Sequence, residues 1–123
     1  MLTGKPVSLT AFAKKALHIY VAKVLAARPI TAIYVFSGQM AQYVPASFAG
    51  RVVMDFVDVD SVKFDAYAAG ARFPASVLYA REARLLSRFE SLTARRATTS
   101  LLVTPEETGL FLSRLGAGPV PSL

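Results

Sequence analysis

Three short apolar runs separated by helical segments constrain the fold of this chain most. Residues 32–36 (AIYVF) and 51–56 (RVVMDF) are rich in β-branched and aromatic side chains, and residues 98–103 form a third run. Apolarity on both faces is typical of parallel strands that helices cover on both sides. Long helical connections between such strands predict a parallel, Rossmann-like sheet.

The predicted fold class is therefore α/β, a partial Rossmann-like three-layer domain. Its small, mostly parallel sheet has strands near residues 31–36, 51–56 and 98–103, and both faces of each strand are expected to be buried. A hydrophobic fraction of 54% is enough for a core. Three parallel strands are few for independent stability, so we expect residues 1–123 to form a single partial domain, a fragment or a member of an obligate assembly.

A first helix is predicted from Ser8 or Thr10, either of which can cap it, to about Ala27, because Pro29 prevents its extension. The apolar residues that recur at three- and four-residue spacing predict its buried stripe: Leu9, Phe12, Ala16, Leu17, Tyr20, Val24 and Ala27. Lys14 and Lys15 occupy the opposite side. A basic amphipathic helix on a membrane has the same pattern, but the strand that follows at once favours a helix that covers the sheet.

The longest helix is predicted from Pro74 to about Arg96. Its predicted buried stripe is Leu78, Leu85, Phe89 and Leu92, and its basic face is Arg81, Arg84, Arg88 and Arg95. Glu82 and Glu90 stand among arginines at helical spacing, which favours intrahelical ion pairs. A buried capping role is the second interpretation of Glu90.

Three shorter helices complete the predicted order. They cover residues 39–43, residues 62–68 before Gly70, and a segment that Thr104 caps, with Pro105 at its first position and Gly116 at its end.

Composition excludes several classes of function. The chain has no cysteine, which rules out disulfides, thiolate zinc sites and cysteine nucleophiles. The net charge is +6, but the cations are scattered and form no nucleic-acid module, so we expect no nucleic-acid partner.

The start of the chain lacks a signal-peptide pattern. Proline and glycine interrupt the uncharged residues 29–50, so these do not form one membrane span. We expect a cytoplasmic protein.

Three carboxylates follow the second strand: Asp55, Asp58 and Asp60. Ligands of open α/β sheets bind beyond the carboxyl ends of strands, which makes these residues candidates for a site. Asp58 and Asp60 form a D-x-D pair, which holds a divalent metal in some sugar transferases, but the pattern is weak and we expect no metal. Bonds to helix N-termini or to arginines are the favoured interpretation.

Other chemistry-bearing motifs are sparse. Ser37 and Gly38 end the first strand and can present backbone N–H groups to an anion, although such a pair is more often a plain turn. His18 is the only histidine and is expected on a solvated surface. Neither a nucleophile elbow, a dinucleotide fingerprint nor a P-loop is present, so we expect no cofactor.

Four segments resemble one family of bacterial sugar transferases, and they are Gly4–Leu9 (GKPVSL), Ser37–Pro45 (SGQMAQYVP), Val53–Ser61 (VMDFVDVDS) and Tyr79–Glu90 (YAREARLLSRFE). They are similar to the family-4, GT-B-fold glycosyltransferases associated with exopolysaccharide and PEP-CTERM/exosortase loci. The run ending at Ser61 is the most specific, and the likeness continues through residues 102–107. Phe64 stands where the family usually has tryptophan, and Thr104 where it has serine.

The resemblance implies sugar transfer from a nucleotide sugar to a glycan or lipid-linked acceptor, without a metal. Family members are much longer and hold the donor in a separate C-terminal domain. This chain would then be the later part of the N-terminal, acceptor-side domain, and an enzyme only if the missing parts are supplied. The resemblance identifies no catalytic residue. It makes six residues acceptor-cleft candidates: Ser37, Gly38, Asp55, Asp58, Asp60 and Ser61.

Two further hypotheses stay open. The first is a non-catalytic α/β module that completes its sheet by forming a homo-oligomer. The second is peripheral contact with the inner face of a membrane through Lys14, Lys15 and the arginine-rich helix, which predicts salt-sensitive binding to anionic vesicles.

Overall fold

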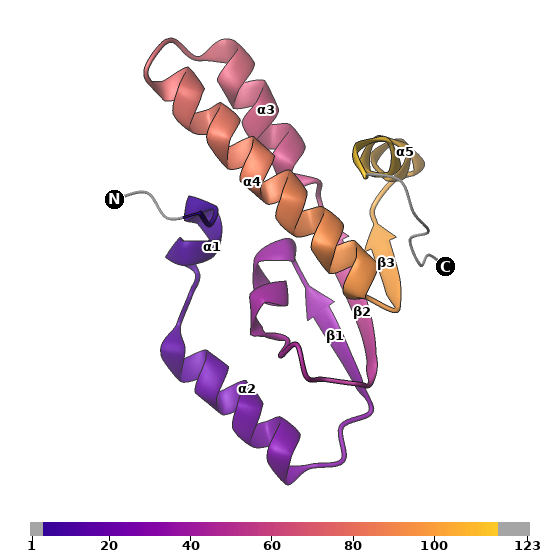
Figure 1. The fold of residues 1–123 in the computed structure, drawn as a ribbon. Coiled ribbons are helices and arrows are strands. Elements are labelled where there is room, and N and C mark those ends of the chain that lie inside the picture. Colours follow the sequence, from indigo (N-terminus) through magenta and orange to yellow (C-terminus); the bar gives the residue numbers. More distant parts are fainter. Residues whose placement is uncertain (1–3, 116–123) are drawn as a thin grey trace.

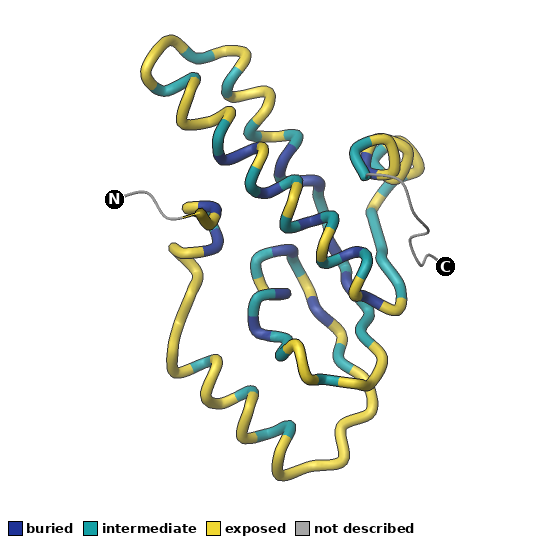
Figure 2. The backbone as a smooth tube through the Cα atoms, in the orientation of Figure 1, coloured by how far each residue is buried: buried dark blue, intermediate teal, exposed yellow. Residues whose placement is uncertain are grey.

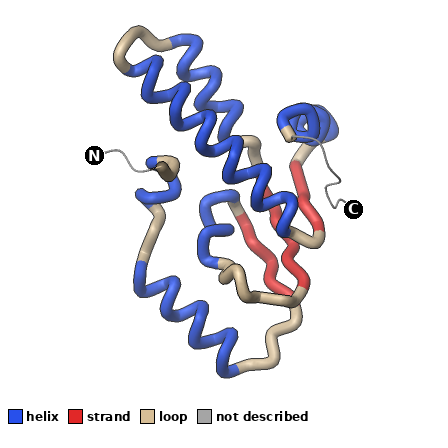
Figure 3. Tube along the Cα trace, in the orientation of Figure 1, coloured by secondary structure: helices blue, strands red, loops and turns tan. Residues whose placement is uncertain are grey.

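The computed structural model describes residues 4–115 and is α/β, with a three-stranded parallel sheet and flanking helices (Figure 1). The elements follow the order α1 (Val7–Ala11), α2 (Lys15–Ala27), β1 (Ala32–Phe36), the 3₁₀ helix η1 (Gly38–Tyr43), β2 (Arg51–Val57), α3 (Asp60–Gly70), α4 (Ala75–Arg96), β3 (Thr99–Leu102) and α5 (Pro105–Arg114). The predicted fold class and strand positions are confirmed. Figure 3 shows the three strands side by side.

The sheet has the order β1-β2-β3, and its register aligns the carboxyl ends of β1 and β2. Ala32 is opposite Arg51 at one end of this pair, and Phe36 is opposite Asp55 at the other. The pairing of β2 with β3 is irregular between Asp55 and Val57. The loops after β1 and β2 therefore leave the sheet at the same edge.

The core lies between the sheet and α4. Met54 of β2 is fully buried, and Ala94 of α4 is also fully buried. Phe56 packs on Phe111 of α5 with 4.9 Å between the ring centroids. Figure 2 shows the buried residues gathered along α4, β1, β2 and η1. One apolar core thus joins the sheet to the helices that follow β2 and β3.

One face of β1 is open, and the prediction that both faces are buried is wrong for this strand. Val35 is buried in the core, whereas Tyr34 and Phe36 are 60% and 62% exposed. Successive side chains of a strand point to opposite faces. Val35 belongs to the core cluster that includes residues of η1, α4 and α5, whereas the aromatic residues of the other face stay largely in solvent.

The predicted continuous helix over residues 8–27 is wrong, because it is two helices separated at residues 12–14. The hydroxyl of Tyr43 lies at the break, where it accepts the Lys14 N–H (2.9 Å) and donates to the Phe12 carbonyl. These two backbone groups lose their helical partners and gain a buried side chain instead. The helix does end at Ala27, as Pro29 predicts.

The predicted buried stripe of this segment is also wrong. Leu9 is buried, but α2 has no buried residue, and Phe12 and Tyr20 are 57% and 65% exposed. Figure 2 shows α2 as exposed or intermediate along its whole length. The helix contacts η1, and its Val21 lines a shallow cavity together with residues of β1 and η1.

The extent of α4 is confirmed, but its predicted buried stripe is wrong at Leu78 and Leu92, while Phe89 of that stripe packs, partly buried, against the core. Leu78 and Leu92 are 52% and 57% exposed. The residues that α4 buries are Glu82, Ala83, Leu86, Glu90 and Ala94. The helix therefore turns a face of two alanines, one leucine and two carboxylates toward the rest of the molecule.

The remaining helix predictions are confirmed. The Thr104 hydroxyl accepts the Glu107 N–H at 3.1 Å, and Pro105 opens α5. Gly116, the predicted end of this helix, lies outside the described residues. No helix within residues 4–115 is long and apolar enough to cross a membrane.

Candidate functional site

The carboxyl ends of β1 and β2 both turn through unusual backbone. Ser37 has φ 76° and Val57 has φ 65°, which are the two positive φ values among described residues other than glycine. A positive φ is costly for a β-branched side chain such as that of Val57. The Ser37 N–H donates to the Asp55 carbonyl at 2.9 Å and holds the two turns together. Such strain often gathers at functional sites.

A polar network links these turns to the start of α3. The Ser37 hydroxyl donates to Gln39 Oε1, and Gln39 Nε2 donates to Asp60 Oδ2 at 3.0 Å. Lys63 Nζ then joins Asp60 Oδ1 (3.3 Å) and Asp58 Oδ2 (2.7 Å). We call these five residues the carboxyl-edge network.

The outer part of the carboxyl-edge network is open to solvent. The Asp58 and Lys63 side chains are 45% and 47% exposed, whereas that of Asp60 is 21% exposed. The hydrogen bond to Asp58 raises the pKa of Lys63, so the ammonium stays charged. Beneath the network, Gly38 is buried, and a Cβ there would lie 3.9 Å from Asp60 Oδ2.

Asp55 lies apart from the other two carboxylates. Its side chain accepts the Tyr34 hydroxyl on the open face of the sheet, and it also accepts the Val57 N–H at 3.1 Å. The hydrogen bond from Tyr34 to Asp55 raises the pKa of the phenol. The acids after β2 therefore do not converge on one point. Asp58 and Asp60 partner Lys63, whereas the sequence favoured arginines or helix N-termini for them.

Ser61 faces the interior and is not available to a ligand. It is fully buried, and Glu90 of α4 accepts its N–H (3.0 Å) and its hydroxyl (2.6 Å). Burial raises the pKa of Glu90, and the two bonds from Ser61 oppose that rise. An internal carboxylate thus occupies the first turn of α3, the position that a bound anion takes in other proteins. This is the capping role that was the second interpretation of Glu90.

Glu82 does the same for α1, a role that the sequence analysis did not predict. Its carboxylate accepts the N–H groups of Val7 (2.7 Å) and Ser8 (2.8 Å) and the Ser8 hydroxyl (2.7 Å). Glu82 and Glu90 are 5% and 4% exposed. The expected intrahelical ion pairs are therefore wrong for both. The available signal was their eight-residue spacing, which places both on one face of a helix.

The carboxyl edge brings three kinds of polar group together. Carboxylate, amide and ammonium groups stand side by side, and such groups exchange hydrogen bonds with the hydroxyls of a polyol. Residues 4–115 hold no group of three histidine or acidic side chains placed to bind a metal. Within the carboxyl-edge network, the Ser37 hydroxyl bonds to an amide oxygen, which is not a base that could activate it.

Comparison with protein-family models, with curated proteins and with solved structures finds no match to this chain.

Proposed function

We propose that this chain is the acceptor-side part of a sugar transferase of polysaccharide synthesis. In this proposal the carboxyl-edge network positions hydroxyl groups of a glycan or lipid-linked acceptor. The nucleotide sugar binds to a second domain, without which the chain is inactive. The proposed location is the cytoplasm, at the inner face of the membrane.

The observation that carries the proposal is the solvent-open network of Asp58, Asp60 and Lys63 beyond two parallel strands. Open α/β sheets bind ligands at this edge. The segment that forms it, residues 53–61, is also the one that most resembles the transferase family. Strained turns at Ser37 and Val57 fit a surface shaped for a ligand.

Titration of the ¹⁵N-labelled chain with oligosaccharides and, separately, with nucleotide sugars tests this proposal. We expect saccharides to shift the amides of Gly38, Gln39 and Asp58 selectively. Asp58→Asn should weaken saccharide binding by about fivefold to tenfold, the loss of one charged hydrogen bond. Glu106→Gln on the exposed start of α5 is the matched control. Tight binding of a nucleotide sugar to this chain alone, or shifts that avoid the carboxyl edge, would contradict the proposal.

Self-association is the second candidate, and the open face of β1 favours it. β1 lies at the edge of the sheet, residues 29–50 carry no charge, and Tyr34 and Phe36 are exposed. An apolar edge strand is a template for pairing with another chain. Sedimentation over a range of concentrations distinguishes the two candidates, because a stable monomer would rule out a module that acts by self-association.

A further inference from the structure

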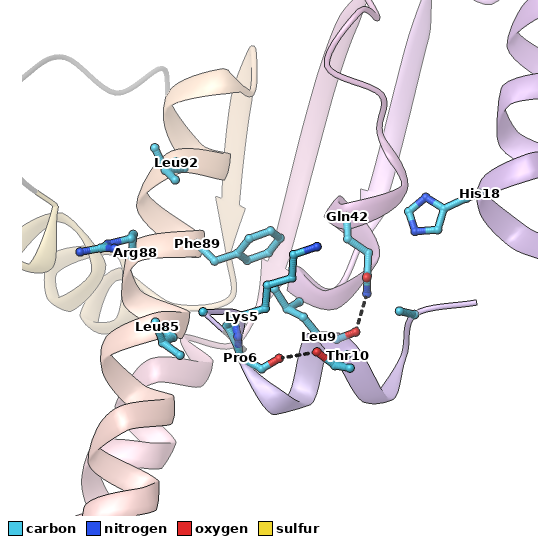
Figure 4. Close-up of a pocket in the computed structure, with 12 residues that line it drawn as sticks. Lys5, Pro6, Leu9, Thr10, His18, Gln42, Leu85, Arg88, Phe89 and Leu92 are labelled. Atoms are coloured by element: carbon cyan, nitrogen blue, oxygen red, sulfur yellow. Dashed lines mark hydrogen bonds between the residues drawn. The ribbon is translucent and has the colours of Figure 1, made fainter. Parts of the chain in front are cut away.

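The hairpin formed by α3 and α4 extends beyond the sheet, and the loop between the two helices lies at its far end (Figure 1). The base of this hairpin is packed, because Ala94 belongs to the core cluster and Val62 and Phe89 pack against it. Figure 4 shows the side of α4 that faces α1, where Leu85 and Phe89 line a cavity together with Leu9. The far end of the hairpin lies outside this packing.

The far end of the hairpin, residues 66–81, exposes large apolar side chains, and we call it the hairpin tip. Phe73 is 81% exposed, more than any other large apolar side chain within residues 4–115. The rings of Tyr67 and Tyr79 pack across the two helices with 5.7 Å between their centroids. The other exposed apolar residues of the tip are Tyr67, Val77 and Leu78. A group of exposed apolar side chains of this kind marks an interaction surface.

The charges on and beside the hairpin tip are positive. Residues 66–81 contain no aspartate or glutamate. Arg72 is exposed next to Phe73, and Arg84 and Arg88 are exposed further along α4. Figure 4 shows the Arg88 guanidinium turned away from the cavity beside α1. None of these three arginines makes an ion pair within residues 4–115.

The two acids that flank the hairpin tip do not offset this charge, because both are engaged within the molecule. Asp65 pairs with Arg114 of α5. Glu82 is buried, and its carboxylate accepts the backbone N–H groups at the start of α1. The tip therefore presents apolar side chains and unopposed positive charge together, which is the chemistry that an anionic lipid surface complements.

We propose that the hairpin tip binds the surface of an anionic lipid bilayer. Phe73, Val77 and Leu78 enter the boundary between head groups and acyl chains, because burial of their apolar surface favours their removal from water. Tyr67 lies at the level of the head groups, where amphipathic aromatic rings are enriched. Arg72 pairs with anionic head groups. A second copy of this chain is a poorer occupant, because it would bring the same positive charges against each other.

This inference gives the membrane location within the proposed function a definite surface, one that includes neither Lys14 nor Lys15. It needs no sugar transfer, and no residue of the carboxyl-edge network lies in the hairpin tip. Saccharide binding at the carboxyl edge and vesicle binding at the tip are measured separately, so that either can fail while the other holds.

Co-sedimentation of the full chain with lipid vesicles tests the charge preference. We expect vesicles that contain phosphatidylglycerol to bind the chain at least about tenfold more tightly than vesicles of phosphatidylcholine alone, and salt should weaken this binding. Absence of binding to the anionic vesicles at low salt, or equal affinity for the two kinds of vesicle, would overturn the proposal.

Matched variants locate the contact. Phe73→Ser should weaken binding to anionic vesicles by about tenfold, and Leu112→Ser at an exposed position of α5 should leave it unchanged. Arg72→Gln should weaken it by about fivefold, and Arg28→Gln at the end of α2 should not. An unchanged affinity in Phe73→Ser would overturn the proposal, as would binding that only Lys14→Gln and Lys15→Gln weaken.

Tryptophan fluorescence distinguishes insertion from contact with the head groups alone. The chain has no tryptophan, so Phe73→Trp places a single reporter at the hairpin tip. We expect its emission to move to shorter wavelength on anionic vesicles and to be quenched by lipids brominated on their acyl chains. Leu112→Trp on α5 should show neither effect. Unchanged emission from vesicle-bound Phe73→Trp would contradict insertion. A dimer that Phe73→Ser dissociates would also overturn the proposal, because a second copy would then cover the tip.

Discussion

Glu90 is a carboxylate buried in the interior of the molecule. A buried carboxylate is costly unless hydrogen bonds compensate it, and Ser61 supplies two. Burial still raises the pKa of Glu90. The folded state therefore binds a proton more readily than the unfolded state between the ordinary glutamate pKa, about 4.3, and the raised value. Through this residue, stability falls as the pH rises across that window.

Replacing Glu90 separates its hydrogen bonds from its charge. Glu90→Ala leaves buried Ser61 groups unpaired and should lower the free energy of unfolding by about 2–3 kcal/mol. Glu90→Gln keeps the shape and should cost less. The difference in stability between Glu90→Gln and wild type should move in favour of the glutamine as the pH rises above the ordinary glutamate pKa, because the raised pKa of Glu90 makes ionisation costly in the folded state. Urea unfolding at several pH values measures both effects.

Glu106→Gln, at an exposed residue of α5, is the control and is measured over the same pH range. A pH-independent difference for Glu90→Gln would show that Glu90 has an ordinary pKa.

At the scale of elements, side chains from other elements bind the backbone at the starts of two helices, α1 and α3. α4 presents Glu82 to α1 and Glu90 to α3, so one helix fixes the starts of two others. Tyr43 of η1 holds the junction between α1 and α2. The break after Phe12 is thus a tertiary feature, in a segment whose local pattern favours a continuous helix.

Removing only the Tyr43 hydroxyl tests that account. Tyr43→Phe keeps the ring, which packs against His18 with 4.4 Å between centroids, but leaves the Phe12 carbonyl and Lys14 N–H without their partner. We expect a loss of about 1 kcal/mol in the free energy of unfolding. Amide exchange should accelerate at the start of α2. Tyr20→Phe, at an exposed residue of α2, is the control. Equal stability of Tyr43→Phe and wild type would assign the break to local sequence.

For the whole molecule, the main feature is a parallel sheet with an open face. Parallel sheets are normally covered on both sides, yet Tyr34 and Phe36 remain in solvent. Each candidate function would account for this open face by a partner that covers it. A further domain would complete the fold of a sugar transferase, and a second copy would complete a self-associating module.

Charges on the open face test the second explanation. If β1 mediates association, Tyr34→Lys and Phe36→Lys should each shift the dimer dissociation constant upward by tenfold or more, because charge at an edge strand opposes pairing. Leu112→Lys on exposed α5 is the control. Sedimentation velocity measures the shift, and an association that all three variants leave intact would place the interface elsewhere.

Sequence alone determined the order of the elements after Pro29 and most of their ends. Pro29 ends a helix, Thr104 and Pro105 begin one, and apolar runs between helices predict parallel strands, because these are local constraints on backbone and burial. The same reasoning located the turn at Ser37 and the acids after β2. These are properties of short segments, which tertiary packing did not override.

Only the tertiary structure decided which faces are buried and which acids meet. The buried face of α4 contains Glu82 and Glu90. Apolar spacing therefore predicted a different face, through Leu78 and Leu92, which is exposed. Asp55 points to the open face while Asp58 and Asp60 share Lys63. A carboxylate such as Glu82 or Glu90 becomes a cap through partners far along the chain. Residue type and spacing do not predict those partners, because distant segments meet only in the folded molecule.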